Sequence, residues 1–311
     1  MTTTTAPNAA IAQLSAALLE VFPDRPSAVR TAVAVFLARG HLLIEDVPGV
    51  GKTTLAKALA QSVGGAVGRV QFTPDLLPSD LTGVSVYRAQ TGEFEFHPGP
   101  LFATVVLGDE INRASPKTQS ALLESMQERQ VTVDGVSHPL PEPFMVIATQ
   151  NPVEMAGTYP LPEAQRDRFM AQLQIGYPPE RAELQMLARG GFADPLIDLP
   201  PALSAEDVRQ AHQVVEDVYA APSVQQYILN LVRATRQHEE ITLGSSPRAG
   251  LQLLAMAKAT AAIAGRDFVL PDDVQDLAVT VLAHRIVTRR GAAATAADLI
   301  SQLVRRLPVP S

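Results

Sequence analysis

The chain contains no cysteine, so disulfide bonds and thiolate metal sites are excluded as sources of stability. Stability must come from packing, and 46% of the 311 residues are hydrophobic. Because single hydrophobic cores usually stop growing at roughly 250 to 300 residues, a chain of this length can form two domains. The 25 prolines indicate many loops and sharply ended elements.

The chain also has no excess of positive charge. Its 25 lysines and arginines are outnumbered by 32 aspartates and glutamates, which gives a formal net charge of -7 and a pI of about 5.4. We therefore expect no broad, sequence-independent binding to nucleic acid or to an anionic membrane. A local basic patch is left open.

Targeting signals and long apolar runs are missing as well. The first residues, MTTTTAPNAA, are polar and predict a disordered lead-in over residues 1–14 rather than a secretory signal. Charged residues interrupt the apolar runs, as Arg39 and His41 do in AVAVFLARGHLLIE, so that none reaches the length of a membrane span. We expect a cytoplasmic protein.

What the sequence does contain is a phosphate-binding loop with one mismatch. Residues 45–54 read EDVPGVGKTT and match the pattern G-x-x-x-x-G-K-[ST] except that Asp46 replaces the first glycine. A short buried strand over Leu42–Ile44 precedes the loop and a helix opens from Thr53, which is the context such a loop needs. An ordinary glycine turn between strand and helix is the alternative.

The chemistry of this loop suits a polyphosphate. Backbone N–H groups and the helix dipole form an anion site, Lys52 adds a point charge, and the Thr53 hydroxyl can bind Mg²⁺. We expect Asp46 to turn its carboxylate away from the phosphates and to accept hydrogen bonds from nearby backbone N–H groups. The predicted nucleotide-binding residues of the loop are Val47, Pro48, Gly49, Val50, Gly51, Lys52, Thr53 and Thr54.

A second strand, ATVVLGDE over Ala103–Glu110, ends in two carboxylates. Asp109 could hold Mg²⁺ through water, and Glu110 could orient or deprotonate a water molecule. The alternative is a pair of acids that caps the next helix. Asn151, at the end of the strand FMVIATQN, could position the attacking water between Glu110 and the γ-phosphate, although a turn asparagine before Pro152 is the simpler reading when it is taken alone.

The order of elements predicts an α/β domain followed by an all-helical one. Strands alternate with helices up to about residue 178, which favours a parallel sheet with helices on both faces. Hairpins are predicted at Thr91-Gly92 and Asp134-Gly135, and Ser115 is a predicted helix cap. Beyond residue 178 the pattern indicates helices, and it predicts them over 204–218, 223–238, 247–264 and 271–287.

Three arginines are candidates for stabilising charge on a transferring phosphoryl group. Arg166 and Arg168 follow the last predicted core strand, and Arg248 opens a helix of the second domain. A surface ion pair is the commoner role of a single arginine.

In combination, these motifs resemble those of AAA+ ATPases, and their amino-acid sequences are most similar to those of the MoxR family. The resemblance covers about residues 15–290 and is carried by GDEINRASPKTQSALLESMQERQVTVDG, VIATQNPVEMAGTYPLPEAQ, LPEAQRDRF and SPRA. It implies an αβα nucleotide-binding core over 15–178, then a linker and helical lid over 179–311. It also implies a Walker A motif at Gly49–Thr54, a Walker B motif at Asp109 and Glu110, and sensor 1 at Asn151.

The resemblance further implies ATP and Mg²⁺ as cofactors and a homo-oligomeric ring, usually a hexamer. Arg168, in the DRF motif, is then the arginine finger for a neighbouring subunit, with Arg166 as the alternative. Sensor 2 falls on Arg248 and is expected to reach the nucleotide of its own chain, and Arg113 is expected near the subunit interface. The adenine-flanking residues are represented by Val21-Phe22-Pro23-Asp24.

By the same resemblance, the function is the remodelling or maturation of partner proteins, often ones with a von Willebrand factor A domain. A nucleic-acid motor is one alternative, but the predicted hairpin over 83–99 sets Arg88 and His97 against Glu93 and Glu95. A nucleotide-gated scaffold with little turnover is another, and the intact Glu110 argues against it. A small-molecule phosphotransferase is least favoured, since no acceptor-site motif is evident.

Overall fold

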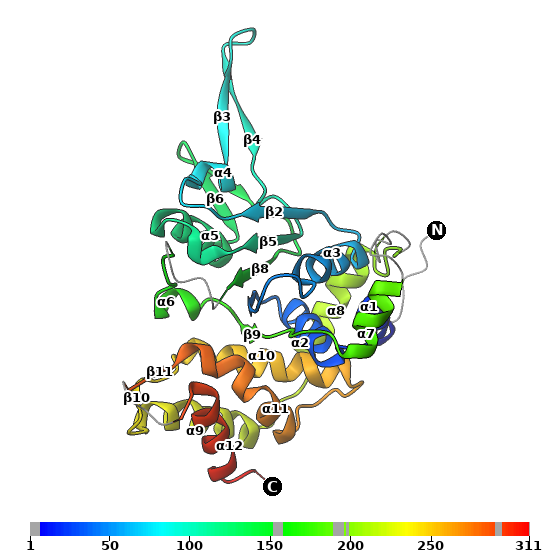
Figure 1. Ribbon diagram of the computed structural model, residues 1–311, viewed down its shortest axis with the longest axis vertical. Helices are drawn as coiled ribbons and strands as arrows, with labels where there is room; N and C mark the ends of the chain where they lie inside the picture. Colours follow the sequence, from blue (N-terminus) through cyan, green and yellow to red (C-terminus); the bar gives the residue numbers. More distant parts are fainter. Residues whose placement is uncertain (1–6, 152–157, 189–195, 197–198, 290–293, 311) are drawn as a thin grey trace.

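The computed structural model describes residues 7–151, 158–188, 196, 199–289 and 294–310. Its centre is a sheet of five strands in the order β2-β5-β8-β1-β9, and every neighbouring pair is parallel (Figure 1). The predicted parallel sheet is therefore confirmed. Its strands are β1 (Leu42–Glu45), β2 (Val67–Gln71), β5 (Val105–Asp109), β8 (Met145–Gln150) and β9 (Ala171–Leu173).

Helices cover both faces of the sheet, because successive side chains of a strand point to opposite faces. Leu42 and Ile44 belong to a core shared with α1 (Pro7–Val21), α2 (Pro26–Leu37) and α3 (Lys52–Ser62). Leu43 belongs instead to a core shared with other elements, among them α4 (Pro78–Thr82) and α5 (Pro116–Glu128).

The first helix begins earlier than the sequence suggested. A disordered lead-in was expected up to residue 14, but α1 begins at Pro7. Ala10, Ile11 and Leu14 are buried in the core, so their burial orders this segment. Residues 1–6 lie outside the described residues.

Both predicted hairpins are present. Strands β3 (Gly83–Arg88) and β4 (Glu93–Pro98) form a long antiparallel hairpin that extends away from the sheet (Figure 1). Strands β6 (Gln130–Val133) and β7 (Val136–Pro139) form a shorter one. The Phe96 ring stacks on the His138 ring with 3.9 Å between centroids, which joins the two hairpins. The short helices η1 (Ile111–Arg113) and α6 (Glu163–Arg166) complete this part of the chain.

The second part of the chain is helical, as predicted. Helix α8 packs against α1, and α10 packs against α2, α8, α9 and α11, so one hydrophobic core runs through both parts. The boundary near residue 178 stays a prediction. The elements are α7 (Glu180–Ala188), α8 (Ala205–Asp217), α9 (Pro222–Gln237), β10 (Ile241–Leu243), α10 (Pro247–Ile263), α11 (Pro271–Leu282), η2 (Ala283–Arg285), β11 (Val287–Thr288) and α12 (Ala296–Arg306). Within the described residues, no helix combines the length and apolarity needed to cross a membrane.

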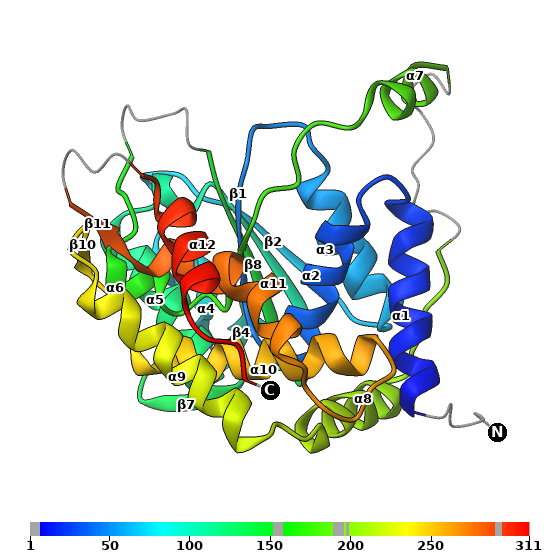
Figure 2. The ribbon, with the colours of Figure 1, turned by 90° about the horizontal axis from the view of Figure 1, so that it is seen from below.

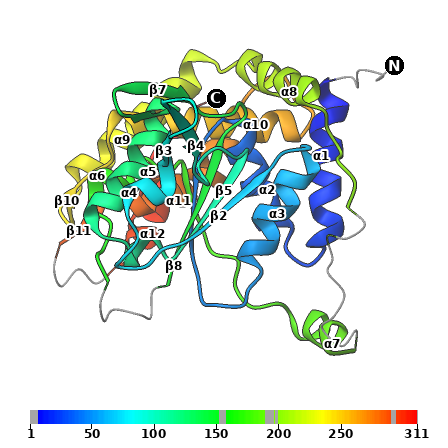
Figure 3. The same cartoon turned by 90° about the horizontal axis from the view of Figure 1, so that it is seen from above.

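A parallel sheet has two different edges, because all its strands begin at one and end at the other. Figures 2 and 3 show the loop between β1 and α3, together with α7, on one side of the molecule, and α8 and α10 on the opposite side. We call the edge where the strands end, which carries residues 46–53, the phosphate-loop edge. The opposite edge, where the strands begin, is called the arginine edge for the residues described below.

Candidate functional site

The loop between β1 and α3 has the backbone of an anion site. Gly49 and Gly51 have φ values of +82° and +96°, in the left-handed region that favours glycine, and α3 begins directly afterwards at Lys52. A Cβ atom built on Gly49 would meet nothing within 4 Å, so the space in front of the loop is open. The N-terminus of α3 therefore faces open space, and a ligand can approach the backbone N–H groups of the loop. This arrangement fits a polyphosphate.

Asp46 is turned into the protein. Its side chain is buried, and its carboxylate accepts hydrogen bonds from the N–H groups of Val47 at 2.8 Å, Ile175 at 2.7 Å and Gly176 at 2.6 Å. The bond to Val47 is of the local kind expected from the sequence, whereas those to Ile175 and Gly176 were not foreseen. The carboxylate therefore connects the phosphate loop to the segment between β9 and α7.

Other groups hold the loop from behind. The Lys52 ammonium donates to the Asp46 carbonyl at 2.9 Å, and the Arg25 guanidinium donates to the Val50 carbonyl at 2.6 Å. A Cβ atom on Gly51 would lie 3.2 Å from the Phe22 ring, so the predicted adenine-flanking segment does reach the loop. Lys52 would have to leave this carbonyl to contact a bound phosphate.

The carboxylates after β5 lie at the same edge. Asp109 is buried, and its carboxylate accepts hydrogen bonds from Arg69 Nε at 3.2 Å and from the Thr149 hydroxyl at 3.4 Å. No group of three or more histidine, aspartate or glutamate side chains that could hold a metal occurs within the part of the chain that the structure describes. Asp109 and Thr53 nevertheless suffice for Mg²⁺ that is bound mainly by nucleotide phosphates and water.

Glu110 has an unusual backbone conformation. Its φ of +60° is uncommon for a residue with a side chain, and its N–H donates to the Thr149 hydroxyl at 2.9 Å. Its carboxylate accepts from the Gln71 amide at 3.2 Å and from Arg113 at 3.1 Å. Arg113, expected near a subunit interface, is thus a direct partner of Glu110, and the carboxylate is oriented before a nucleotide binds.

Asn151 directly follows β8, the strand between β5 and β1, and its side chain is buried. The sheet therefore brings Asn151 to the same edge as Glu110 and the phosphate loop.

Sequence reasoning missed Arg69, Gln71 and Thr149. Arg69 and Gln71 are two residues apart on β2, so their side chains point to the same face of the sheet. This spacing is the signal in the sequence that could have identified them as a pair.

The arginines gather at the other edge of the sheet. A cleft of about 210 Å³ is lined by four of them, and also by Gly40 and His41 just before β1. Arg248 is one of the four, so this arrangement argues against the expectation that it reaches the nucleotide of its own chain, because the phosphate loop follows the other end of β1. The arginines are Arg39, Arg129, Arg168 and Arg248.

Only Arg168 of the two finger candidates lines this cleft. It donates a hydrogen bond to the Leu123 carbonyl, whereas Arg166 lies 3.8 Å from Glu163 and outside the cleft lining. Among the described residues, Arg129, Arg168 and Arg248 form no ion pair with a carboxylate. Unpaired cations that converge on one cleft favour an anionic ligand.

Asp167 connects the segments that carry two of these arginines. The Ser246 hydroxyl lies 2.9 Å from both carboxylate oxygens, and Arg285 Nη1 donates to one of them at 2.9 Å. Arg285 is buried, and desolvation lowers the pKa of its guanidinium to about 10. Since Ser246 caps α10 and Arg248 lies in its first turn, Asp167 fixes the position of Arg248 relative to Arg168.

Three buried histidines surround the same edge. Burial lowers the pKa of His41 and of His212 to about 4 and that of His284 to about 3. Nearby arginines contribute in the same direction, Arg129 for His41 and Arg285 for His284. All three rings are therefore neutral near pH 7.

Comparison with known families agrees with this geometry. Residues 41–171 match the family described as "ATPase family associated with various cellular activities (AAA)". Residues 233–303 match the family described as "AAA lid domain". The two matches cover the sheet with its phosphate loop and the helices that carry Arg248.

Individual relatives cover most of the chain. The Bacillus subtilis protein YeaC is 53% identical over 82% of this chain and 80% of its own length. Chaperone MoxR1 of Mycobacterium tuberculosis is 43% identical over 81% of this chain and 68% of its own length, and protein MoxR of Paracoccus denitrificans is 33% identical over 95% of each. A crystal structure of a Cytophaga hutchinsonii protein superposes with a TM-score of 0.89 at 36% identity and covers 98% of this chain and 97% of its own.

Proposed function

The chain belongs to the MoxR family of AAA+ ATPases, and from this premise we propose that it hydrolyses ATP in a ring of identical subunits in order to remodel partner proteins. The observation that carries the proposal is the separation of the site into two halves. The phosphate loop and the carboxylates lie at one edge of the sheet, and the unpaired arginines lie at the other. On this proposal, one subunit supplies only half of a complete site.

Binding of the nucleotide falls to the phosphate-loop edge. Backbone N–H groups from Gly49 to Thr54 would hold the phosphates, and Lys52 would exchange the Asp46 carbonyl for a phosphate oxygen. Thr53 and Asp109 would hold Mg²⁺, which neutralises charge on the phosphates when it is bound.

The hydrolytic water would be activated by Glu110. Its carboxylate would accept a proton from the attacking water, and the Asn151 amide at the neighbouring strand end would orient that water. Because Gln71 and Arg113 already hold the Glu110 carboxylate, its position is set by residues on two different elements. The constrained backbone of Glu110 is typical of residues at functional sites.

The arginine edge would complete the site of the next subunit. In a head-to-tail ring, which we propose to be a hexamer, the arginine edge of one copy faces the phosphate-loop edge of its neighbour. Arg168 would then contact the neighbour's γ-phosphate as an arginine finger, and Arg248 would reach the same nucleotide from the lid. Both arginines thus act between subunits.

The partners of the ring are proposed to be proteins. One relative is named as a chaperone, and proteins with a von Willebrand factor A domain are the partner class that the family resemblance favours. The long hairpin β3–β4 does not look like a nucleic-acid grip, since Arg88 is paired with Glu95. Binding to double-stranded DNA that weakens steeply with salt would instead favour a nucleic-acid motor.

The test is steady-state phosphate release by the purified full-length chain with Mg²⁺ and ATP. We expect Glu110→Gln to lower turnover at least about a hundredfold while ATP binding is retained, since general-base catalysis contributes on this order. Glu239→Gln, at an exposed position after α9, is the matched control and should leave turnover unchanged. Turnover that survives in Glu110→Gln would remove Glu110 from the mechanism.

A further inference from the structure

Helix α7 is an exposed helix that stands away from the rest of the molecule and carries both charged residues and leucines. Its Leu184 and Leu187 side chains are 59% and 77% exposed, and Tyr177 just before it is 72% exposed. No other described helix or strand packs extensively along it. Figures 2 and 3 show α7 protruding on the side of the phosphate loop. Such exposed leucines are typical of a surface that binds another surface.

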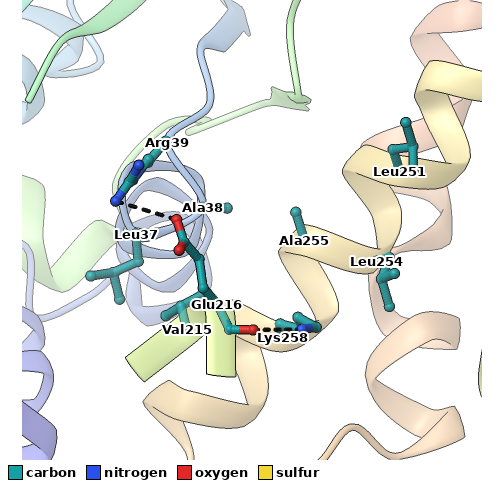
Figure 4. Close-up of a pocket in the computed structure, with 9 residues that line it drawn as sticks. All are labelled: Leu37, Ala38, Arg39, Val215, Glu216, Leu251, Leu254, Ala255 and Lys258. Carbon is teal, nitrogen blue, oxygen red and sulfur yellow. Dashed lines mark hydrogen bonds and ion pairs between the residues drawn. The ribbon is translucent and has the colours of Figure 1, made fainter. Parts of the chain in front are cut away.

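The side of the molecule that bears the arginine edge carries an apolar groove. The groove has a volume of about 220 Å³ and lies between α2, α8 and α10 (Figure 4). Leu251 on its rim is 70% exposed, while Leu37 and Val215 at its base are buried. Arg39 lines both this groove and the arginine cleft, so the two are neighbours on the surface.

We propose that α7 of one subunit docks into the groove between α2, α8 and α10 of the next subunit. This inference rests on the proposed ring. The head-to-tail contact that brings the arginines to a neighbour's phosphate loop also brings the groove to that neighbour's α7. The phosphate loop is connected to the chain just before α7, since the Asp46 carboxylate accepts a hydrogen bond from Gly176, four residues before α7 begins. The arginine cleft and the groove are neighbours on the same subunit, since Arg39 lines both.

The two surfaces match in length and apolar pattern. Helix α7 has 9 residues and is about 13 Å long, and the stretch of α10 from Leu251 to Lys258 rises by about 10 Å. Leu184 and Leu187 are three residues apart and share one face of α7. On α10, Leu251, Leu254 and Ala255 share one face in the same way.

The charges of the two surfaces are also complementary. Glu180 and Glu183 lie in the first turn of α7, on the side that carries the leucines. Arg39 and Lys258 lie at the groove, where Arg39 is paired with Glu216 at 3.3 Å (Figure 4). Lys258 donates a hydrogen bond to the Glu216 carbonyl and forms no ion pair within the described part of the chain. An acidic helix start beside two leucines therefore fits a groove with an apolar base and the unpaired Lys258 ammonium on its rim.

Because the chain has no cysteine, the contact can be tested by crosslinking the full-length protein. Leu187→Cys and Leu251→Cys are introduced together, and the protein is treated with a short bismaleimide with and without ATP. We expect an ATP-dependent ladder of crosslinked subunits that extends to the size of the ring. A mixture of the two single variants should yield crosslinked dimers and nothing larger, and each single variant alone should yield none.

The matched control combines Leu187→Cys with Val309→Cys. Val309 is 51% exposed and follows α12, which lies at the end of the molecule opposite the β3–β4 hairpin (Figure 1). This pair should give no ladder. The proposal is overturned if ATP produces a ring by light scattering but the Leu187→Cys/Leu251→Cys protein shows no ladder. Crosslinks in Leu187→Cys alone, which would indicate a symmetric α7 contact, also overturn it.

Two further measurements separate this inference from the ring itself. Leu251→Cys in the ATP-bound ring should react with a maleimide dye at least about tenfold more slowly than in the monomer. An equal rate would show that the groove stays open in the ring. If ATP leaves the mass of the wild-type protein at that of a monomer, the proposed ring fails, and the docking fails with it.

Discussion

The phosphate-loop edge and the arginine edge of the sheet are assembled in different ways. At the first, the loop, the two carboxylates and Asn151 all sit where parallel strands end, and Asp46, Asp109 and Asn151 are buried. At the second, Arg39, Arg129, Arg168 and Arg248 come from helix ends and from the lid, and they converge on an open cleft.

The partners of the charged groups differ in the same way. At the phosphate-loop edge, Asp46, Asp109 and Glu110 all accept hydrogen bonds inside the subunit. At the arginine edge, three of the four arginines form no ion pair within the described part of the chain. On the proposed function, the first edge binds the nucleotide, and the second presents charge to a ligand held by another subunit.

The largest expected effect follows from separating the two edges onto different subunits. Arg168→Ala should lower turnover about a thousandfold, since an arginine finger is worth 10³ or more. Mixing it with Glu110→Gln, which is also inactive alone, should restore part of the activity, because some interfaces then pair an intact arginine edge with an intact phosphate-loop edge. Phosphate release by the mixture checks this. Arg233→Ala, at an exposed position of α9, serves as the control arginine and should stay near wild type in phosphate release.

The absence of any recovery in the mixture, with rings present, would show that Arg168 acts inside its own subunit. The comparison of the two edges would then lose its functional meaning.

A smaller effect is expected from the joint that holds the arginine edge together. Asp167→Asn removes the charge that Arg285 binds in a buried position, and breaking such a pair costs about 3 to 5 kcal/mol of unfolding free energy. Turnover should fall as well, because Arg168 and Arg248 lose their common anchor. Chemical denaturation and phosphate release measure the two effects. Glu206→Gln disrupts an exposed ion pair with Arg209 and should change neither.

The folded protein should lose stability in mild acid because of the three buried histidines at the arginine edge. His41, His212 and His284 have pKa values of about 4, 4 and 3 in the folded protein, against 6.5 when unfolded. Since the unfolded chain binds protons that the folded chain does not, stability is complete above about pH 6.5 and falls as the pH drops toward 4. Each histidine contributes up to about 1.4 kcal/mol per pH unit in this window.

Thermal unfolding between pH 7 and 4.5 checks the effect. His41→Gln should reduce the slope, whereas His97→Gln, on the exposed hairpin, should leave it unchanged. A slope that does not respond to His41→Gln would mean that other groups dominate acid unfolding.

The smallest effect is expected at the phosphate-loop edge. Asp46→Gly should change ATP affinity by less than about threefold, or about 0.7 kcal/mol, because the carboxylate is already held by Val47, Ile175 and Gly176. The melting temperature should fall, since these N–H groups lose their acceptor. Isothermal titration with ATP and thermal unfolding give the two values. A large gain in affinity would reveal electrostatic repulsion between Asp46 and the phosphates.

Much of the phosphate-loop edge could be predicted from the sequence because its residues follow strands directly. In a parallel sheet every strand ends at the same edge, so Asp109, Glu110 and Asn151 had to lie near the loop once their strands were recognised. The conformation of Gly49 and Gly51 is likewise a local property of the chain. The partner Thr149 was missed, since a single polar residue within a buried strand carries no distinctive pattern, and the alternation of Arg69 and Gln71 on β2 does not by itself name their partners.

The arginine edge and the placement of α7 were decided by tertiary structure. Arg168 and Arg248 lie far apart in the sequence, and the Asp167–Arg285–Ser246 contacts bring them together. The packing of α10 against α2 and α8 then sets the side of the sheet that Arg248 occupies, and this placement is the reason for proposing that it serves a neighbour's nucleotide. The sequence by itself determined which residues are candidates for binding and hydrolysing ATP, because strand ends and glycine turns act locally. Only the tertiary structure decided which of them share a subunit's site, because that depends on how a whole hydrophobic core packs.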